Sequence, residues 1–197
     1  MPTFRSTSRS TTHASANARD QILGDLKDDH KRVKKAYRDF QKMDSEEAPE
    51  ACKELVDQVL DELTVHVQLE EELLYPAARS VIDDGDLMDE AEVEHESVKT
   101  LIEQLRAMSP LDEKYAARFT VLCEYVQHHV KEEEGEMFPK LERAHLDWEN
   151  MATEMTKRRQ EMAPDTAGFS PDADLVGAAS EDSVARQKRK PAARKRS

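Results

Sequence analysis

The feature that most constrains this chain is a pair of matching segments, HVQLEEELLYP at residues 66–76 and HVKEEEGEMFP at residues 129–139. In both, a His is followed four residues later by a Glu, and an aromatic residue and a Pro follow at the same distances. A spacing of four places two side chains one turn apart on the same face of a helix. His66 with Glu70, and His129 with Glu133, can therefore each reach one common ion.

Apolar residues recur at steps of three and four around these segments, which is the period of an amphipathic helix face. The pattern predicts a first helix from about residue 20 to 43 and a second that ends before the stop at residues 83–86. A third helix ends at Ser109-Pro110, and a fourth runs into Pro139. Because short connections make neighbouring helices antiparallel, we expect an all-α, up-down-up-down four-helix bundle.

Six polar side chains lie on the stripes where the helical period calls for apolar residues. Burying ionised carboxylates and imidazoles is costly unless something pairs them, and no Lys or Arg shares these stripes. A multivalent cation would pair them. Two copies of one unit, each a lone inward His followed by a His-x3-Glu helix, supply the predicted set: His30, His66, Glu70, His95, His129 and Glu133.

With these motifs the sequence resembles the bacterial hemerythrin-like proteins of the HHE cation-binding domain family, over about residues 20–142. The resemblance implies a non-haem site for two Fe ions joined by an oxo or hydroxo bridge. It also implies that His30, His66, His95 and His129 are terminal ligands and that both Glu side chains bridge. Imidazole with carboxylate suits iron, although Zn or Mn could occupy the same ligands.

One departure concerns the third helix. Oxygen-carrying hemerythrins have two His four residues apart there, whereas Ala91 and Lys99 occupy the positions four before and four after His95. Reversible oxygen carriage is therefore not the expectation, and roughly two coordination positions of two octahedral ions stay open. Candidates for an extra ligand, or for a hydrogen bond to a ligand, are Glu62, Glu92 and Tyr125. Glu71 and Glu134 either accept hydrogen bonds from the ligands or face solvent.

The function that follows is a di-iron protein that binds or reacts with a small ligand (O2, NO or peroxide), or that holds iron, in stress response or sensing. Enzymatic turnover is left open, and binding is favoured over it. A ferritin-like carboxylate oxidase would need Glu-x-x-His twice. Glu92-x-x-His95 is the one instance on a ligand stripe, and the stop at residues 83–86 is too short for the long crossover often found in that class.

Charge divides the chain into segments. The net charge is −13, but residues 20–185 carry −23, because residues 1–19 and 186–197 hold Arg and Lys and no acid. Segments so poor in large apolar residues are expected to be disordered, which predicts a basic head at residues 1–19 and a tail at 164–197. An alternative function follows, in which a metal-free helical protein binds nucleic acid through this basic tail.

No apolar run is long enough to span a bilayer, and residues 1–19 do not read as a signal peptide. Two cysteines, Cys52 and Cys123, make no disulfide framework, so we expect a cytoplasmic protein. An additional helix at 143–163 is expected either to cover the bundle or to mediate a dimer, and the oligomeric state stays open. His145 and Trp148 on this segment are expected to cap one end of the bundle.

Overall fold

The computed structural model describes residues 8–162, with side chains described from residue 13 onward. This part of the chain contains helices and no strand. Four long helices form the predicted bundle, and short helical segments extend the second and fourth of them. The elements are α1 (Ser8–Phe40), α2 (Pro49–Leu69), η1 (Glu70–Leu74), α3 (Tyr75–Arg79), α4 (Gly85–Arg106), α5 (Tyr115–Glu132), η2 (Glu133–Met137), α6 (Phe138–Leu141) and α7 (Trp148–Met162).

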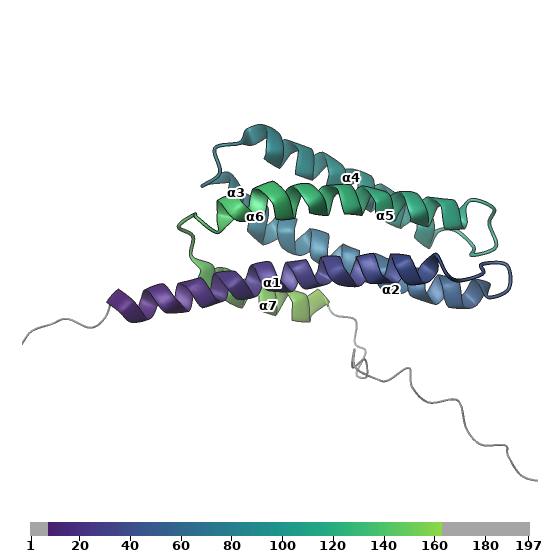
Figure 1. Cartoon of the computed structure of the whole chain (residues 1–197), viewed down its shortest axis with the longest axis horizontal. Coiled ribbons are helices and arrows are strands. Elements are labelled where there is room, and N and C mark those ends of the chain that lie inside the picture. Colours follow the sequence, from purple (N-terminus) through teal and green to yellow (C-terminus); the bar gives the residue numbers. More distant parts are fainter. Residues whose placement is uncertain (1–7, 163–197) are drawn as a thin grey trace, which may run out of the picture. The chain divides into compact units, whose positions relative to one another are not determined.

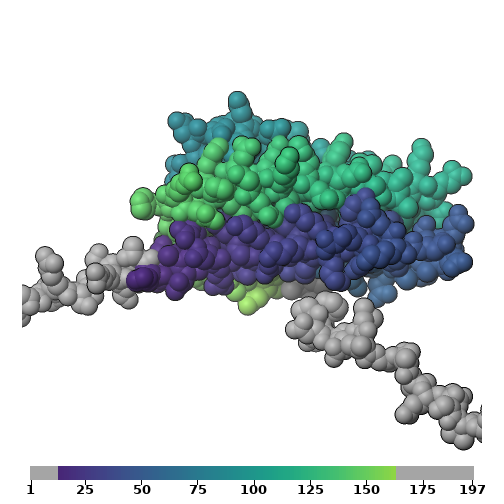
Figure 2. All heavy atoms as spheres, viewed as in Figure 1, coloured from purple at the N-terminus to yellow at the C-terminus, as the bar shows by residue number. Residues whose placement is uncertain are grey.

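The four long helices run alternately up and down, and consecutive helices are neighbours (Figure 1). Helix α1 packs against α2 and α5, and α4 packs against α2 and α5, which closes the square of the bundle. One face of the molecule is formed by side chains of α1 and α5 that meet along their length (Figure 2). This arrangement brings one stripe from every long helix to a common interior.

Helix α1 is longer than the sequence predicted. It begins at Ser8, whereas disorder was expected up to residue 19. The composition argument missed two contacts that attach this stretch to the bundle: Ala18 packs against buried apolar residues, and the guanidinium of Arg19 donates a hydrogen bond to the carbonyl of Glu142 at 2.9 Å. The predicted tail at 164–197 lies outside the described residues.

Both His-x3-Glu helices change from α to π geometry at the Glu. The amide of Tyr75 donates to the carbonyl of Glu70, and that of Phe138 donates to the carbonyl of Glu133, five residues back in each case. Each π turn comes just before a Pro, whose ring would clash with the carbonyl four residues earlier in a regular α-helix. Such π turns are frequent at functional sites, and here each one begins at a buried carboxylate.

Two apolar cores lie on either side of the polar stripe. One core holds residues such as Phe40, Leu60 and Phe119, and the other holds residues such as Leu26, Phe138 and Trp148. Cys52 and Cys123 are free thiols in the first core, where they pack as small apolar groups. The polar residues between the cores are thus shielded from water at both ends.

Helix α7 covers part of the bundle. It is separated from α6 by a turn at residues 142–147 and packs against α1 and α2 of the same chain. Trp148 and Met155 are buried in the second core, as expected for a capping segment, and Arg158 pairs with Glu72 at 2.7 Å. His145 is exposed in the preceding turn. None of the described helices has the length and apolar character needed to cross a membrane.

Candidate metal centre

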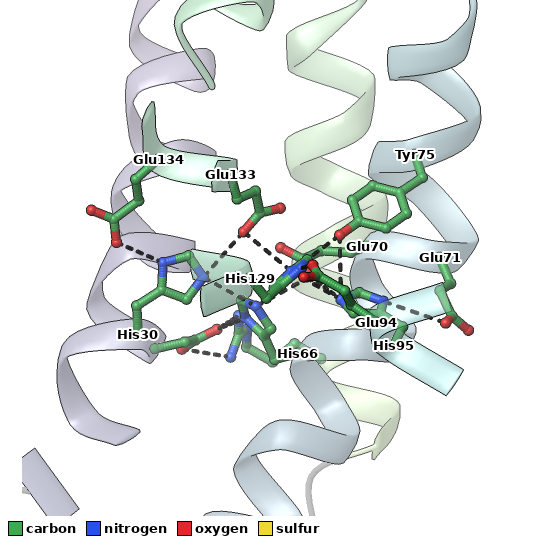
Figure 3. Close-up of polar contacts among 12 residues, drawn as sticks. His30, His66, Glu70, Glu71, Tyr75, Glu94, His95, His129, Glu133 and Glu134 are labelled. Carbon is green, nitrogen blue, oxygen red and sulfur yellow. Dashed lines mark hydrogen bonds and ion pairs between the residues drawn. The ribbon is translucent and has the colours of Figure 1, made fainter. Parts of the chain in front are cut away.

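The six predicted ligands meet in the middle of the bundle (Figure 3). All six are buried, with exposed fractions of 4% or less. Nε2 of His30 lies 3.2 Å from Nε2 of His66, and Nε2 of His95 lies 3.1 Å from Nε2 of His129. Two donors about 2.1 Å from one ion and at right angles to each other are about 3 Å apart, so these spacings suit shared coordination.

The two carboxylates lie between the His pairs. One oxygen of Glu70 is 3.1 Å from Nε2 of His66 and 3.4 Å from Nε2 of His95. One oxygen of Glu133 is 3.3 Å from Nε2 of His30 and 3.8 Å from Nε2 of His129. Each carboxylate thus lies within 3.8 Å of one His from each pair.

Donor atoms within 4.8 Å of one another form two groups. The first is His30, His66, Glu70 and Glu133, and the second is Glu70, His95 and His129. Glu70 belongs to both. The two groups of possible metal ligands are therefore adjacent and have one carboxylate in common.

Each ligand imidazole faces a second carboxylate with its outer nitrogen. Nδ1 of His30 donates to Glu134 at 2.8 Å, and Nδ1 of His129 donates to Glu94 at 2.8 Å. The remaining two contacts are His66 Nδ1 to Asp29 at 3.2 Å and His95 Nδ1 to Glu71 at 3.3 Å. The His95 contact is not a hydrogen bond, whereas the other three are. Because a carboxylate can only accept, a neutral imidazole in such a hydrogen bond holds its proton on Nδ1 and points a lone pair from Nε2 into the centre.

Cationic side chains surround three of these four outer carboxylates. Asp29 pairs with Arg32 and with Arg159 of α7, the latter at 2.7 Å. Lys99 lies 2.7 Å from Glu71, and Lys34 lies 3.9 Å from Glu134. Burial alone would raise the pKa of Asp29, but hydrogen bonds from His66 and Arg159 lower it well below the usual range. Asp29 is therefore held as an acceptor.

The same buried charges shift the pKa values of the inner residues. Burial and the charge of Glu133 raise the pKa of Glu70. Burial would lower the pKa of His66, but Glu70 and Asp29 raise it to about 10. Burial and the neighbouring His129 lower the pKa of His95 to about 3. Neighbouring groups thus have pKa values shifted in different directions. Such shifts are typical of sites where several ionisable side chains lie close together.

The buried oxygens give the test of whether a metal fits. Neither oxygen of Glu70 nor of Glu133 has a hydrogen-bond partner, and Nδ1 of His95 has none either. Buried carboxylate oxygens without hydrogen-bond partners are destabilising by several kcal/mol. Metal ions bound here would satisfy these oxygens, so the residues fit the group that their spacing predicted.

Of the three further candidates, Tyr125 and Glu92 lie away from the inner residues, whereas Glu62 lines the small cavity beside the histidines. Tyr125 is 50% exposed and lines a groove on the outside of the bundle. Glu92 pairs with Arg79 at 2.7 Å on the surface. Glu62 accepts a hydrogen bond from Arg32 at 3.1 Å, and Arg32 also pairs with Asp29. A residue three or four positions from a predicted ligand can thus lie either inside the bundle or at its surface, and the spacing alone does not distinguish the two.

Sequence reasoning missed three residues that contact the ligands. Asp29 and Glu94 each directly precede the lone His of their half, so this repeated acid-His pair was a visible signal. Tyr75 was noted only as the aromatic of the first matching segment. Its hydroxyl lies 3.2 Å from Nε2 of His95 and 3.4 Å from Nε2 of His129.

Tyr75 breaks the symmetry between the halves. Phe138 occupies the corresponding position of the second segment and stacks on His30, while Tyr75 stacks on His95. Burial, followed by the negative charges of Glu70 and Glu133, raises the pKa of Tyr75 well above its usual value, so the phenol keeps its proton. The imidazoles of His95 and His129 thus have a hydroxyl beside them, whereas His30 has an apolar ring.

The fold and the convergent imidazole and carboxylate groups define a helical-bundle protein of the metal-binding class. The chain belongs to the hemerythrin HHE cation binding domain family, whose sequence pattern matches residues 21–141 and again residues 86–190. The second match starts within α4, where the second copy of the repeated unit begins, and extends beyond the described residues. The predicted family and bundle are thereby confirmed.

A solved structure and a curated protein are similar to this chain. A hemerythrin HHE cation binding domain-containing protein from Mycobacterium kansasii has a TM-score of 0.56 and 26% identity, over 69% of this chain and 85% of its own. A DNA nickase from Nostoc sp. is 31% identical over 130 residues, which are 66% of this chain. The matched region spans about a third of that nickase, 34% of its length.

Proposed function

We propose that this protein is a non-haem di-iron protein of hemerythrin type, which binds or reacts with a small ligand such as O2, NO or peroxide, or holds iron, in stress response or sensing. The observation that carries the proposal is the pair of ligand groups that share the buried carboxylate of Glu70. Four imidazoles and two carboxylates favour iron, and Zn or Mn fits the same donors. The two thiols, Cys52 and Cys123, are in keeping with a cytoplasmic location.

Bound iron supplies the redox chemistry of this class. The protein contributes a fixed set of donors: hydrogen bonds to outer carboxylates orient His30, His66 and His129, which limits the rearrangement needed when a ligand binds. The hydroxyl of Tyr75 is placed to donate a hydrogen bond beside His95 and His129.

A small cavity beside the histidines limits what can bind. Its volume is about 20 Å3, and apolar side chains such as Val33, Val98 and Val126 wall it. A space of roughly 10–15 Å3 accommodates one water molecule, so this cavity suits a water or a diatomic molecule and excludes organic substrates. The size and the apolar lining support a gas or peroxide as the ligand.

The first test is metal content with a spectrum from the same sample. Protein purified without added metal, or reconstituted anaerobically with Fe2+, should contain about two iron ions per chain, as expected for paired sites. After oxidation of the bound iron by air, a near-ultraviolet oxo-to-ferric absorption band that shifts on adding azide would show an open coordination position. Iron that stays well below one per chain after reconstitution would contradict the proposal.

A second candidate function is contact with DNA. Two observations favour it: the similarity to the Nostoc DNA nickase, and the seven basic residues without an acid at positions 186–197. Binding through this tail should weaken steeply with salt and disappear when residues 186–197 are deleted. Plasmid nicking by the iron-loaded protein that a chelator abolishes would link this function to the metal centre. Nicking and binding that are both undetectable at low salt would eliminate it.

A further inference from the structure

A second group of possible metal ligands lies on the outside of the bundle, at the α4–α5 face. Nε2 of His128 is 3.2 Å from Oε1 of Glu132 and 3.5 Å from Oε1 of Glu94. The donor atoms of all three residues lie within 4.8 Å of one another. His128 is 59% exposed, and Glu94 and Glu132 are partly exposed, so solvent ions reach this group directly.

Glu94 connects this group to the buried centre. Its Oε2 accepts a hydrogen bond from Nδ1 of His129 at 2.8 Å, while its Oε1 faces His128. The other three outer carboxylates each have an Arg or Lys within 4 Å. Within the described part of the chain, neither Glu94 nor Glu132 has such a partner. Within the described residues, the ion-pair partners of these two adjacent carboxylates are therefore imidazoles, those of His128 and His129.

The first half of the bundle has apolar residues at the positions that correspond to His128 and Glu132. Val65 and Leu69 occupy the positions that correspond to His128 and Glu132 in the aligned segments. Both pack into the apolar core that includes α7 residues, and Arg159 of α7 supplies the charge that pairs with Asp29. Among the described residues, no helix covers the corresponding face of the second half in the way that α7 covers the first. His128 and Glu132 occupy that face.

We propose that Glu94, His128 and Glu132 form a second, surface metal site for a divalent first-row transition-metal ion, which takes up Fe2+ for delivery to the buried centre. One imidazole and two carboxylates are ligands that such ions prefer, with the remaining positions filled by water. The site neutralises both carboxylates. The uptake role rests on the proposed function of the buried centre, whereas the existence of the surface site does not.

The surface site is tested by calorimetric titration of the iron-loaded protein with Zn2+. Wild type should bind one more Zn2+ per chain than His128→Ala, and Glu132→Gln should weaken this binding about 10-fold or more, as for loss of a metal ligand's charge. His145→Ala and Glu96→Gln replace exposed residues outside the group and should bind as wild type does. Equal Zn2+ binding by wild type and His128→Ala would overturn the proposal.

The uptake role is tested by following iron per chain against time after anaerobic addition of limiting Fe2+. His128→Ala should fill the buried centre several-fold more slowly and still reach the wild-type final content. Loss of Zn2+ binding with unchanged uptake would overturn the uptake role and leave the surface site standing. If wild type takes up no iron, the proposed di-iron function fails, while the Zn2+ difference between wild type and His128→Ala still reports the surface site.

Discussion

Nδ1 of His30 donates a hydrogen bond to Oε1 of Glu134 over 2.8 Å, and these two residues come from opposite halves of the internal repeat. His95 faces Glu71 in the reciprocal way at 3.3 Å. The Glu after each inner carboxylate therefore lies beside the lone His of the other half, with a hydrogen bond in the case of Glu134. The two halves of the repeat are therefore connected by these outer contacts as well as by the contacts among the six inner residues.

Replacing Glu134 with Gln should weaken metal binding about 10- to 100-fold without unfolding the protein, because loss of this partner reduces the orientation and basicity of a ligand His. Titration against a chelator of known affinity measures the change. Glu136→Gln is the matched control, since Glu136 lies exposed two residues further on and should leave metal affinity unaltered. Equal losses in both variants would indicate a general charge effect.

Substitution of the proposed ligands should remove metal. His66→Ala and His129→Ala each delete a donor from one of the two groups, so iron per chain should fall by about one or more ions. His13→Ala and His145→Ala replace exposed histidines and should retain the full content. Metal analysis after gel filtration gives the answer, and a His66→Ala protein with full iron content would exclude His66 as a ligand.

The six inner residues were predictable because they violate the apolar period of their helices. Helical spacing alone then implied which side chains share a face. What the sequence did not reveal is where each stripe ends: Tyr125 is spaced one turn from His129, yet the α5 helix places it on the outer surface. Contacts between helices, such as Glu94 with His129, depend on the register of α4 against α5, which no local pattern determines.

The length of the first helix was underestimated for a similar reason. Residues 13–19 have few large apolar side chains, so the composition predicted disorder, but α1 extends through them. The helix is continuous there, and Arg19 reaches the carbonyl of Glu142, which is distant in sequence. A composition argument does not include such a contact.

Metal affinity should fall as the pH falls from 7.5 to 5, because protons compete for the ligand imidazoles. Without metal, the pKa of His66 is raised to about 10 by Glu70 and Asp29, against the lowering effect of burial, so coordination at pH 7.5 must displace its proton. Each displaced proton changes the affinity about tenfold per pH unit. Calorimetry in buffers of different ionisation enthalpy counts the protons released. A metal content and affinity equal at both pH values would argue against His ligation.

Removal of metal should lower the melting temperature. The oxygens of Glu70 and Glu133 would then be buried without partners, and binding of metal to the folded state alone stabilises it. A ligand at 100 times its Kd contributes about 2.7 kcal/mol, which corresponds to roughly 5–10 °C for a chain of this size. Calorimetry with and without a chelator measures the shift.

The double variant Glu70→Gln/Glu133→Gln supplies the control for that experiment. It removes both buried charges and both bridging donors, so a chelator should leave its melting temperature unchanged. A chelator shift as large as that of wild type would place the stabilising metal elsewhere in the protein.

Tyr75→Phe should change how the centre binds an added anion and leave its metal content intact. The substitution makes the first half match the second, where Phe138 stands, and removes the hydroxyl near His95 and His129. Loss of a hydrogen bond to a charged ligand is worth about 1.5 kcal/mol or more, so azide affinity should fall about tenfold. Spectroscopic titration of the iron-loaded protein measures the affinity, and Tyr125→Phe on the outer face is the matched control. An azide affinity equal to wild type would show that the bound anion lies on the side of Phe138, away from the tyrosine.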